Sequence, residues 1–238
     1  MRQRDFGRFV TWLRALGFDA RHPVLIALIV TSGCVTAPLV RTPSPLHLAA
    51  AERDTSKTIQ LLNVIDPNVR FSPYDPSKVD WRTESTPLHW AATHGAMSLI
   101  EPLVMAGARV NARGTIGWTP LHCAAYAGHP LTCERLVRFG SRMGAQTPSG
   151  ITPMHLAAWA GHPETLTRLT ALGGDPNTTT DSGETPLHVA AAAGHPKTVR
   201  RLLDLGADPD ATTRTGEKAV DLARLYRHRK TAEVLNGG

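Results

Sequence analysis

The sequence predicts an all-α fold, a solenoid of about six similar helix pairs stacked side by side. Three observations predict it. A Thr-Pro-(Leu/Met)-His motif recurs, and its four threonines are 33 residues apart each time. Glycine and proline recur at fixed places within each repeat, which marks them as turn residues. Aromatic residues make up only 5% of the chain, which favours thin layers of alanine, leucine and valine over one compact core.

The first 33 residues have the make-up of a secretory signal peptide. Five arginines precede a short apolar run, and residues 24–34 read VLIALIVTSGC. This run is shorter than the about 20 apolar residues that a bilayer-spanning helix needs. The small residues 31–33 followed by Cys34 resemble the lipobox of bacterial lipoproteins, in which this cysteine is acylated and becomes the mature amino terminus.

That resemblance implies a periplasmic protein held on a bacterial membrane by lipid on Cys34, because two or three acyl chains give stable attachment. Residues 34–43 then form a short tether. Two alternatives stay open. One is a single uncleaved amino-terminal membrane anchor over residues 24–40, against which Pro38 argues, and the other is a cytoplasmic protein.

Residues 44–80 are expected to form an amino-terminal unit with an insertion. Ser44 opens the motif SPLHLAA 42 residues before Thr86, which is nine more than the regular spacing. The extra residues fall at about 64–80, where the prolines predict a long loop. Residues 52–54 read Glu-Arg-Asp, where later units have a Gly-His turn.

Residues 81–212 comprise four regular repeats that begin at Thr86, Thr119, Thr152 and Thr185. In each, the threonine is expected to cap a first helix, and the following proline to occupy its first turn, where a missing N–H is tolerated. A glycine then ends this helix in a left-handed turn, and a second helix runs to another glycine. The turn glycines are Gly95, Gly128, Gly161 and Gly194, and the later ones are Gly107, Gly140, Gly173 and Gly206.

Two further features depart from this pattern. Pro102 lies inside the second helix of the Thr86 repeat, where we expect it to bend or delay the helix. Residues 213–238 keep the pattern in degraded form and end in an arginine-rich polar stretch. Such a polar face is typical of a capping repeat that closes a stack against water.

The TPLHxAA motif and its 33-residue period over residues 44–238 resemble those of the ankyrin-repeat family. The resemblance implies that the polar stretch after each second helix folds into a hairpin finger. It implies a protein partner, bound by the fingertips and the inner face of the first helices. It also implies that histidines at two repeated positions bond to threonine hydroxyls and backbone groups: His47, His89, His122, His155 and His188 in the motif, and His129, His162 and His195 in the turn.

These histidines do not predict a metal site or a cofactor. Equivalent imidazoles of successive repeats lie about 10 Å apart, the spacing of packed helices, whereas zinc needs ligands about 2 Å from one centre. Cys123 and Cys133 fill apolar slots of one repeat, which favours two buried thiols. A disulfide between them is the alternative in an exported protein.

Composition and motifs also exclude several functions. The net charge is +6, of which residues 1–33 carry +3, so the repeats have no nucleic-acid footprint. The chain holds no nucleophile elbow, P-loop, HExxH or glycine-rich nucleotide motif. We therefore expect neither an enzyme nor a small-molecule substrate.

The predicted binding residues occupy variable slots, namely the residue before the motif threonine and the two after the alanine pair. Tryptophan and tyrosine are the usual anchors of protein interfaces, and we expect those in these slots to be exposed. The predicted partner-binding residues are Trp118, Tyr126, Ile151, Trp159, Thr93 and His94. The predicted function is that of a periplasmic adaptor, protector or inhibitor, including an immunity protein, of one partner. The alternative is a secreted effector that engages a host protein, which would have no use for the lipobox-like Cys34.

Overall fold

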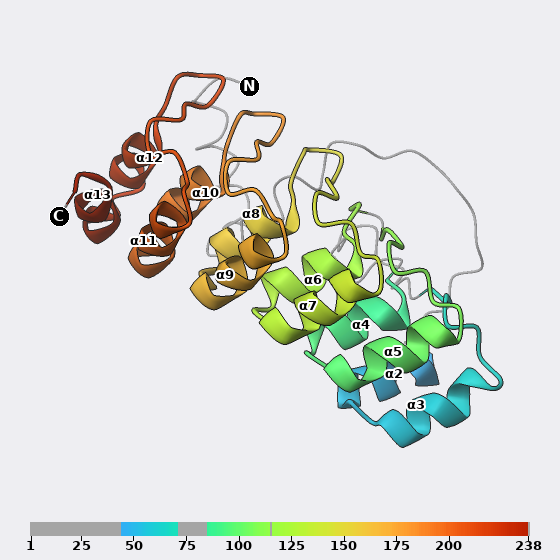
Figure 1. The fold of residues 1–238 in the computed structure, drawn as a ribbon. Coiled ribbons are helices and arrows are strands. Elements are labelled where there is room, and N and C mark those ends of the chain that lie inside the picture. The colour runs from blue at the N-terminus through green and yellow to red at the C-terminus, as the bar shows by residue number, and fades with distance from the viewer. Residues whose placement is uncertain (1–43, 71–84, 115, 238) are drawn as a thin grey trace, which may run out of the picture.

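The computed structural model describes residues 44–70, 85–114 and 116–237. Over these residues the chain forms twelve helices and no strand. The helices pair into six units whose members lie in two rows (Figure 1). The predicted all-α solenoid of about six units is confirmed.

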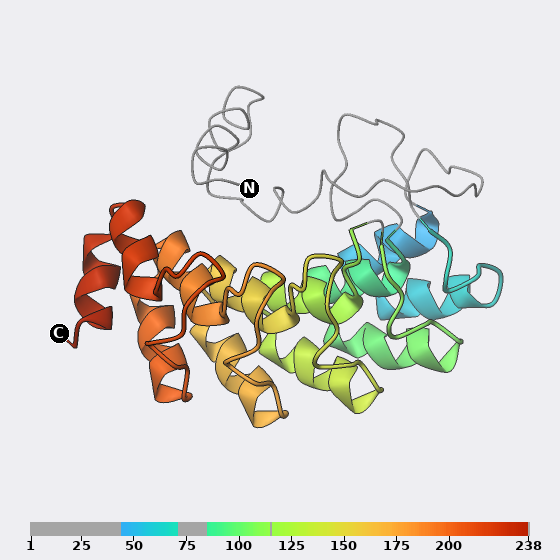
Figure 2. The ribbon, with the colours of Figure 1, turned by 90° about the horizontal axis from the view of Figure 1, so that it is seen from above.

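The two rows are made of alternate helices along the chain, and Figure 2 shows them from above. The first row comprises α2 (Pro45–Glu52), α4 (Pro87–Thr93), α6 (Pro120–Tyr126), α8 (Pro153–Ala160), α10 (Pro186–Ala193) and α12 (Ala219–Leu225). The second row comprises α3 (Thr55–Leu62), α5 (Met97–Met105), α7 (Pro130–Arg138), α9 (Pro163–Ala171), α11 (Pro196–Asp204) and α13 (Arg229–Leu235). Each first-row helix packs on its neighbours in the row and on its second-row partner, so the core runs between the rows.

The first-row helices of the regular repeats begin as predicted. The motif threonine is the N-cap residue with extended backbone, and proline is the first helical residue, in α4, α6, α8 and α10. The alanine pair inside each helix is fully buried, as Ala124 and Ala125 illustrate. Side chains this small let neighbouring first-row helices approach closely.

Glycine is required in the turn for two reasons, its backbone conformation and the close packing around it. Gly128 has φ of +76°, a conformation that residues with a Cβ adopt only at a cost. A Cβ added there would lie 2.6 Å from the ring of His162 in the next unit. The predicted left-handed turn is thus confirmed, and the turn histidine packs against it. The first and last units use Arg53 and Arg227 at this place, with φ of 60° and 62°.

Pro102 does not shorten its helix. α5 has nine residues, as many as α7, α9 and α11, and continues past the proline to Met105. The expectation that Pro102 would delay the helix is therefore wrong. Leu99, Ile100 and Leu103 of this helix are fully buried, so tertiary packing holds it despite the lost backbone hydrogen bond.

The motif histidines connect each unit to the next one along the chain. Nδ1 of His89 accepts from the backbone N–H of Thr86 at 3.1 Å and contacts the Thr86 hydroxyl at 2.9 Å. The ring proton is therefore on Nε2, which donates to the carbonyl of Trp118 at 3.1 Å. His122, His155 and His188 repeat this arrangement. The bonds to threonine hydroxyls and backbone groups that the family resemblance implied are confirmed.

The turn histidines connect each unit to the one before it. Nε2 of His162 lies 3.1 Å from the carbonyl oxygen of Tyr126, and Nε2 of His195 lies 2.8 Å from that of Trp159. His129 makes the same contact with Thr93. Successive units are thus bonded to each other in both directions, always through backbone carbonyls.

Asparagine side chains make a third connection at three of the four junctions among the first five units. The side-chain nitrogen of Asn111 donates to the carbonyl of Gly140 at 3.0 Å, and its Oδ1 accepts from the N–H of Arg142 at 2.9 Å. Asn177 forms the same two hydrogen bonds with the following unit. The third unit has Gly144 at this position, so the junction to the unit of α8 and α9 lacks the asparagine bridge, although His122 and His162 still connect the two units.

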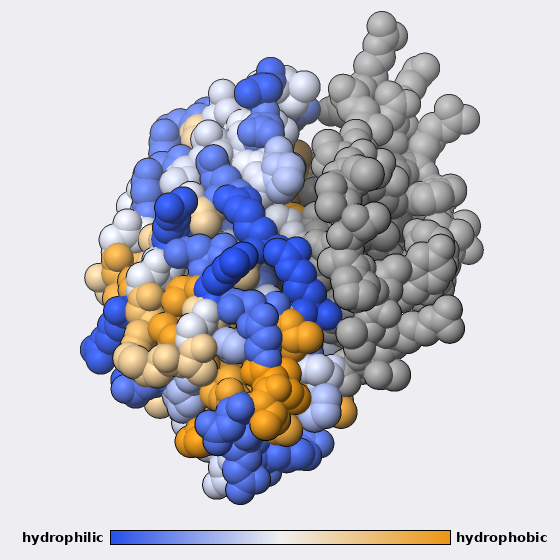
Figure 3. Space-filling view, turned by 90° about the vertical axis from the view of Figure 1, so that its right-hand side faces the viewer, coloured by the Kyte–Doolittle hydropathy of each residue, from blue (hydrophilic) through white to orange (hydrophobic). Residues whose placement is uncertain are grey.

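The two ends of the stack differ. Figure 3 looks onto the end formed by α2 and α3, where apolar surface gathers, and where Ile59 and Val64 are exposed. At the other end α13 exposes Arg229 and Lys230. Residues 71–80 of the expected insertion lie outside the described residues, as do the predicted signal peptide and Cys34. No helix in the described part of the chain is long and apolar enough to cross a membrane.

Candidate protein-binding face

The first-row helices carry a line of partly exposed aromatic side chains. Tyr126 of α6 and Trp159 of α8 occupy equivalent positions, 33 residues apart. Trp90 of α4 lies on the same helix face one turn earlier, and its ring stacks on that of His94 with centroids 6.0 Å apart. All four are half-buried. We call Trp90, His94, Tyr126 and Trp159 the aromatic line.

Trp118 does not belong to this line, which corrects the expectation that it is exposed. Its side chain is only 3% exposed, and it packs within the core. The ring lies against Tyr126 with centroids 5.4 Å apart, and the carbonyl accepts from His89. Trp118 therefore supports Tyr126 from beneath and presents little surface to a partner.

Sequence reasoning missed Trp90 and Leu48. The equivalent slot holds Cys123 and Leu156 in the next two repeats, which are apolar and predict a core position, and both are buried. In the first two units it opens to solvent: Trp90 is half-buried, and Leu48 of α2 is 43% exposed. The available signal was the i, i+3 spacing of Trp90 and Thr93, which places both on one helix face.

Thr93 and Ile151, the other predicted binding residues, lie beside the aromatic line and are half-buried. The hydroxyl of Thr93 donates to the carbonyl of His89 at 2.9 Å. Ile151 precedes the motif threonine of its repeat, where its carbonyl accepts from His122. Their contact with a partner stays a prediction.

In the repeat after Trp159 the face carries small side chains and an acidic residue, before Leu225 of α12 again exposes an apolar side chain in the last unit. Ala192 and Ala193 of α10 take the two slots that follow the alanine pair, and both are half-buried. Glu184 precedes the motif threonine in the slot that Ile151 holds one repeat earlier. Burial and the Glu184 carboxylate raise the pKa of Tyr226, which follows α12, to about 12. Glu184 is therefore close enough to the Tyr226 hydroxyl to act on it electrostatically.

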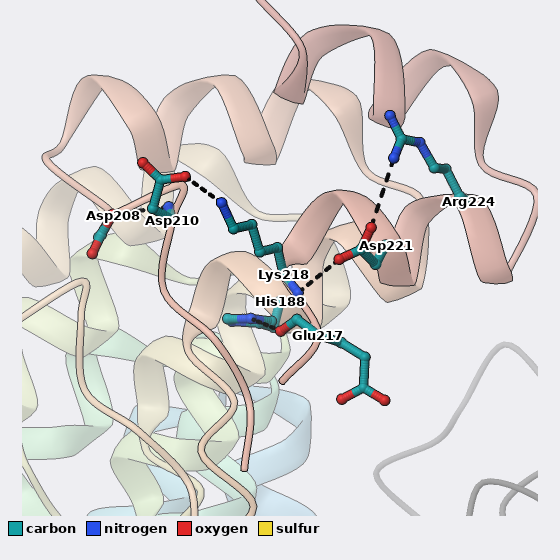
Figure 4. A network of polar contacts seen from close by, with 7 residues as sticks. All are labelled: His188, Asp208, Asp210, Glu217, Lys218, Asp221 and Arg224. Carbon is teal, nitrogen blue, oxygen red and sulfur yellow. Dashed lines mark hydrogen bonds and ion pairs between the residues drawn. The ribbon is translucent and has the colours of Figure 1, made fainter. Parts of the chain in front are cut away.

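Charged residues of the last finger and of the start and body of α12 form two ion pairs, which Figure 4 shows. Lys218 pairs with Asp210 at 2.8 Å, and Arg224 with Asp221 at 3.7 Å. The Glu217 side chain points away from both pairs. The hydroxyls of Thr213 and Thr215 donate to its carboxylate and hold the pKa of Glu217 below its ordinary value, so it stays ionised.

The motif histidines are titratable groups buried inside the stack. Burial lowers the pKa of His89, His122 and His155 from 6.5 to about 4, which outweighs the hydrogen bond that each donates. They are neutral at physiological pH, as the proton position on Nε2 requires. Among the described residues no three His, Cys, Asp or Glu side chains are grouped so that they could hold a metal ion.

Cys123 and Cys133 are separate free thiols, so the disulfide considered as an alternative is wrong. Cys123 lies on α6 and Cys133 on α7, and each fills the core slot of an aliphatic residue of other repeats. Burial raises the pKa of both thiols to about 12. Each sulfur thus behaves as a small apolar group.

Comparison with protein families identifies the class. The family model described as "Ankyrin repeats (3 copies)" matches residues 46–142, 88–180 and 154–237, which together cover most of the chain. The chain belongs to the ankyrin-repeat family. It is a protein–protein interaction module, and members of this family are typically binding scaffolds without catalytic activity.

Proposed function

We propose that this chain is a membrane-tethered periplasmic protein that binds one protein partner through the aromatic line. It serves as an adaptor for that partner, or as its protector or inhibitor. The observation that carries the proposal is the half-buried aromatic line itself. Large apolar side chains that reach solvent side by side are normally avoided unless they mark a contact site.

The stack does not need these aromatic residues. The slot of Tyr126 and Trp159 holds Thr93 in the repeat before them and Ala192 in the repeat after them. All four residues accept the same hydrogen bond, from a turn histidine to the backbone carbonyl. Since alanine suffices at this position, stacking of the repeats does not require an aromatic side chain there.

The test compares Trp159→Ala with Leu131→Ala as baits for proteins of the cell envelope. Leu131 is 54% exposed on the second-row helix α7, so this control removes an apolar side chain of the opposite row. Losing an anchor costs at least about 2 kcal/mol, or roughly thirtyfold in affinity. We expect one protein to be retained by the wild type and Leu131→Ala and lost with Trp159→Ala. The melting temperatures of all three should agree, and unfolding of Trp159→Ala would show that the ring is core.

The proposed tether rests on Cys34 and the apolar run before it. Acylation needs the thiol, so Cys34→Ser is expected to yield an unprocessed or soluble form, whereas the wild type fractionates with membranes. Immunoblotting of cell fractions measures both properties. Normal processing and membrane retention of Cys34→Ser would refute the lipid anchor. That result would leave partner binding by the repeats untouched.

A further inference from the structure

We infer that the partner presents a basic segment next to its apolar contact residues, and that a lysine or arginine of this segment lies over Ala192 and Ala193 beside Glu184. The inference rests on the proposed function, because it concerns the same face. It adds the chemistry of the partner and the direction in which the partner lies along the stack.

The charge of the fingers reverses halfway along the stack. Residues 108–118 and 141–151 contain three arginines and no carboxylate. Residues 174–184 and 207–217 contain six carboxylates and one arginine. An extended partner segment that crosses the row therefore meets opposite fields at its two ends, which fixes its orientation.

The reversal is also present in the single slot before the motif threonine. In the last three units this slot holds Ile151, Glu184 and Glu217. Ile151 lies beside the aromatic line, and the two acidic residues lie beyond it. The apolar and acidic parts of the face are thus continuous, and one segment can contact both.

Glu184 and Asp181 have no cationic neighbour of their own. Among the described residues no lysine or arginine nitrogen lies within 4.0 Å of either carboxylate, although Asp210 and Asp221 each have one. The only side-chain hydrogen bond described for the Glu184 carboxylate is from the neutral hydroxyl of Ser182. A cation from the partner can therefore complement the Glu184 carboxylate.

The surface that Ala192 and Ala193 form beside Glu184 suits a long cationic side chain. Ala192 is smaller than Thr93, Tyr126 and Trp159, which hold its slot in the three preceding repeats, and both Ala192 and Ala193 reach solvent. α10, which carries them, packs between α8 with Trp159 and α12, which Tyr226 follows. An apolar stem can lie on the alanine methyl groups, with aromatic rings on either side and the charged head at Glu184.

The experiment selects peptides from a random 16-residue library displayed on phage, with the full-length chain as bait. The strongest peptide is synthesised, and its Kd is measured for the wild type, Glu184→Lys, Glu164→Lys and Trp159→Ala. Glu164 is exposed at the start of α9 in the second row, so Glu164→Lys makes the same charge change away from the face. Far-UV melting curves confirm that each variant is folded.

We expect selected peptides to combine apolar residues with lysine or arginine. Glu184→Lys should raise the Kd about tenfold or more and Glu164→Lys should not, and the wild-type Kd should rise with salt. Peptides without basic residues that need Trp159 but tolerate Glu184→Lys would overturn the inference and leave the proposed function standing. Peptides indifferent to both substitutions, or none above background, would overturn both. Concentration-dependent dimers that Glu184→Lys abolishes would identify a second copy of the chain as the occupant and also overturn it.

Discussion

Gly144 stands where two other repeats carry a bridging asparagine, so a substitution at this position can restore the missing bridge. Gly144→Asn should recreate the bridge that Asn111 and Asn177 make at other junctions. A Cβ at Gly144 meets no atom within 4 Å, and its φ is not among the positive values, so an asparagine fits without strain. The amide would donate to the carbonyl of Gly173 and accept from the N–H of Asp175, the equivalents of Gly140 and Arg142.

The gain can be worked out from two terms. Each net hydrogen bond contributes about 0.5–1.5 kcal/mol, and the low end applies to a site this exposed. Replacing glycine contributes about 0.4–1 kcal/mol by restricting the unfolded chain. Ordering the side chain offsets part of this, so we expect about 1–2 kcal/mol in total. For a domain of this size that is a rise of roughly 2–8 °C in melting temperature.

The control is Gly144→Ala, which gains the unfolded-state term without the bridge. Urea unfolding followed by circular dichroism compares the two variants with the wild type. Amide exchange adds a local readout, because the N–H of Asp175 should exchange more slowly only in Gly144→Asn. Equal stability of the two variants, with unchanged exchange at Asp175, would show that the asparagine connection contributes nothing to the stack.

Two further predictions concern the histidines and the turn glycines. The free energy of unfolding should fall as the pH drops from about 6.5 towards 4, because the buried histidines stay neutral in the folded state and become protonated in the unfolded state. At pH 5.5 each of these histidines should lower the free energy of unfolding by an amount on the order of 1 kcal/mol. A urea midpoint that does not depend on pH would contradict this. The histidines with a pKa of about 4 are His47, His89, His122 and His155. Gly128→Ala should lower the unfolding free energy by about 2–4 kcal/mol, since backbone strain adds to the collision with the His162 ring. Gly140→Ala, with φ of +90° and open space around it, should cost only the strain of about 1–2 kcal/mol, and equal losses would refute the contact.

The repeat made the fold predictable, because its signals are local. Thr-Pro at a helix start and glycine at a helix end act through their own backbone conformations, so helix bounds followed from the sequence. Pro102 was misjudged for the opposite reason. Its helix is held by the burial of Leu99, Ile100 and Leu103, which a helix propensity does not contain.

The candidate face was only partly predictable. Slot position correctly predicted that Tyr126 and Trp159 reach solvent, because both lie at regular places on regular repeats. It failed for Trp118, whose ring turns inward under Tyr126, and for Trp90, whose slot is buried in the next two repeats. The direction of a large ring depends on the side chains of neighbouring repeats, and a single repeat does not carry that information.

The backbone bonds of the turn histidines have a consequence for how such a protein changes over generations. The carbonyls of Thr93, Tyr126, Trp159 and Ala192 accept these bonds whatever side chain each residue carries. Mutation at these four positions therefore alters what the surface recognises while leaving the attachment between neighbouring repeats intact. A lineage can drift from one partner to another by single substitutions at these positions, without passing through unfolded intermediates.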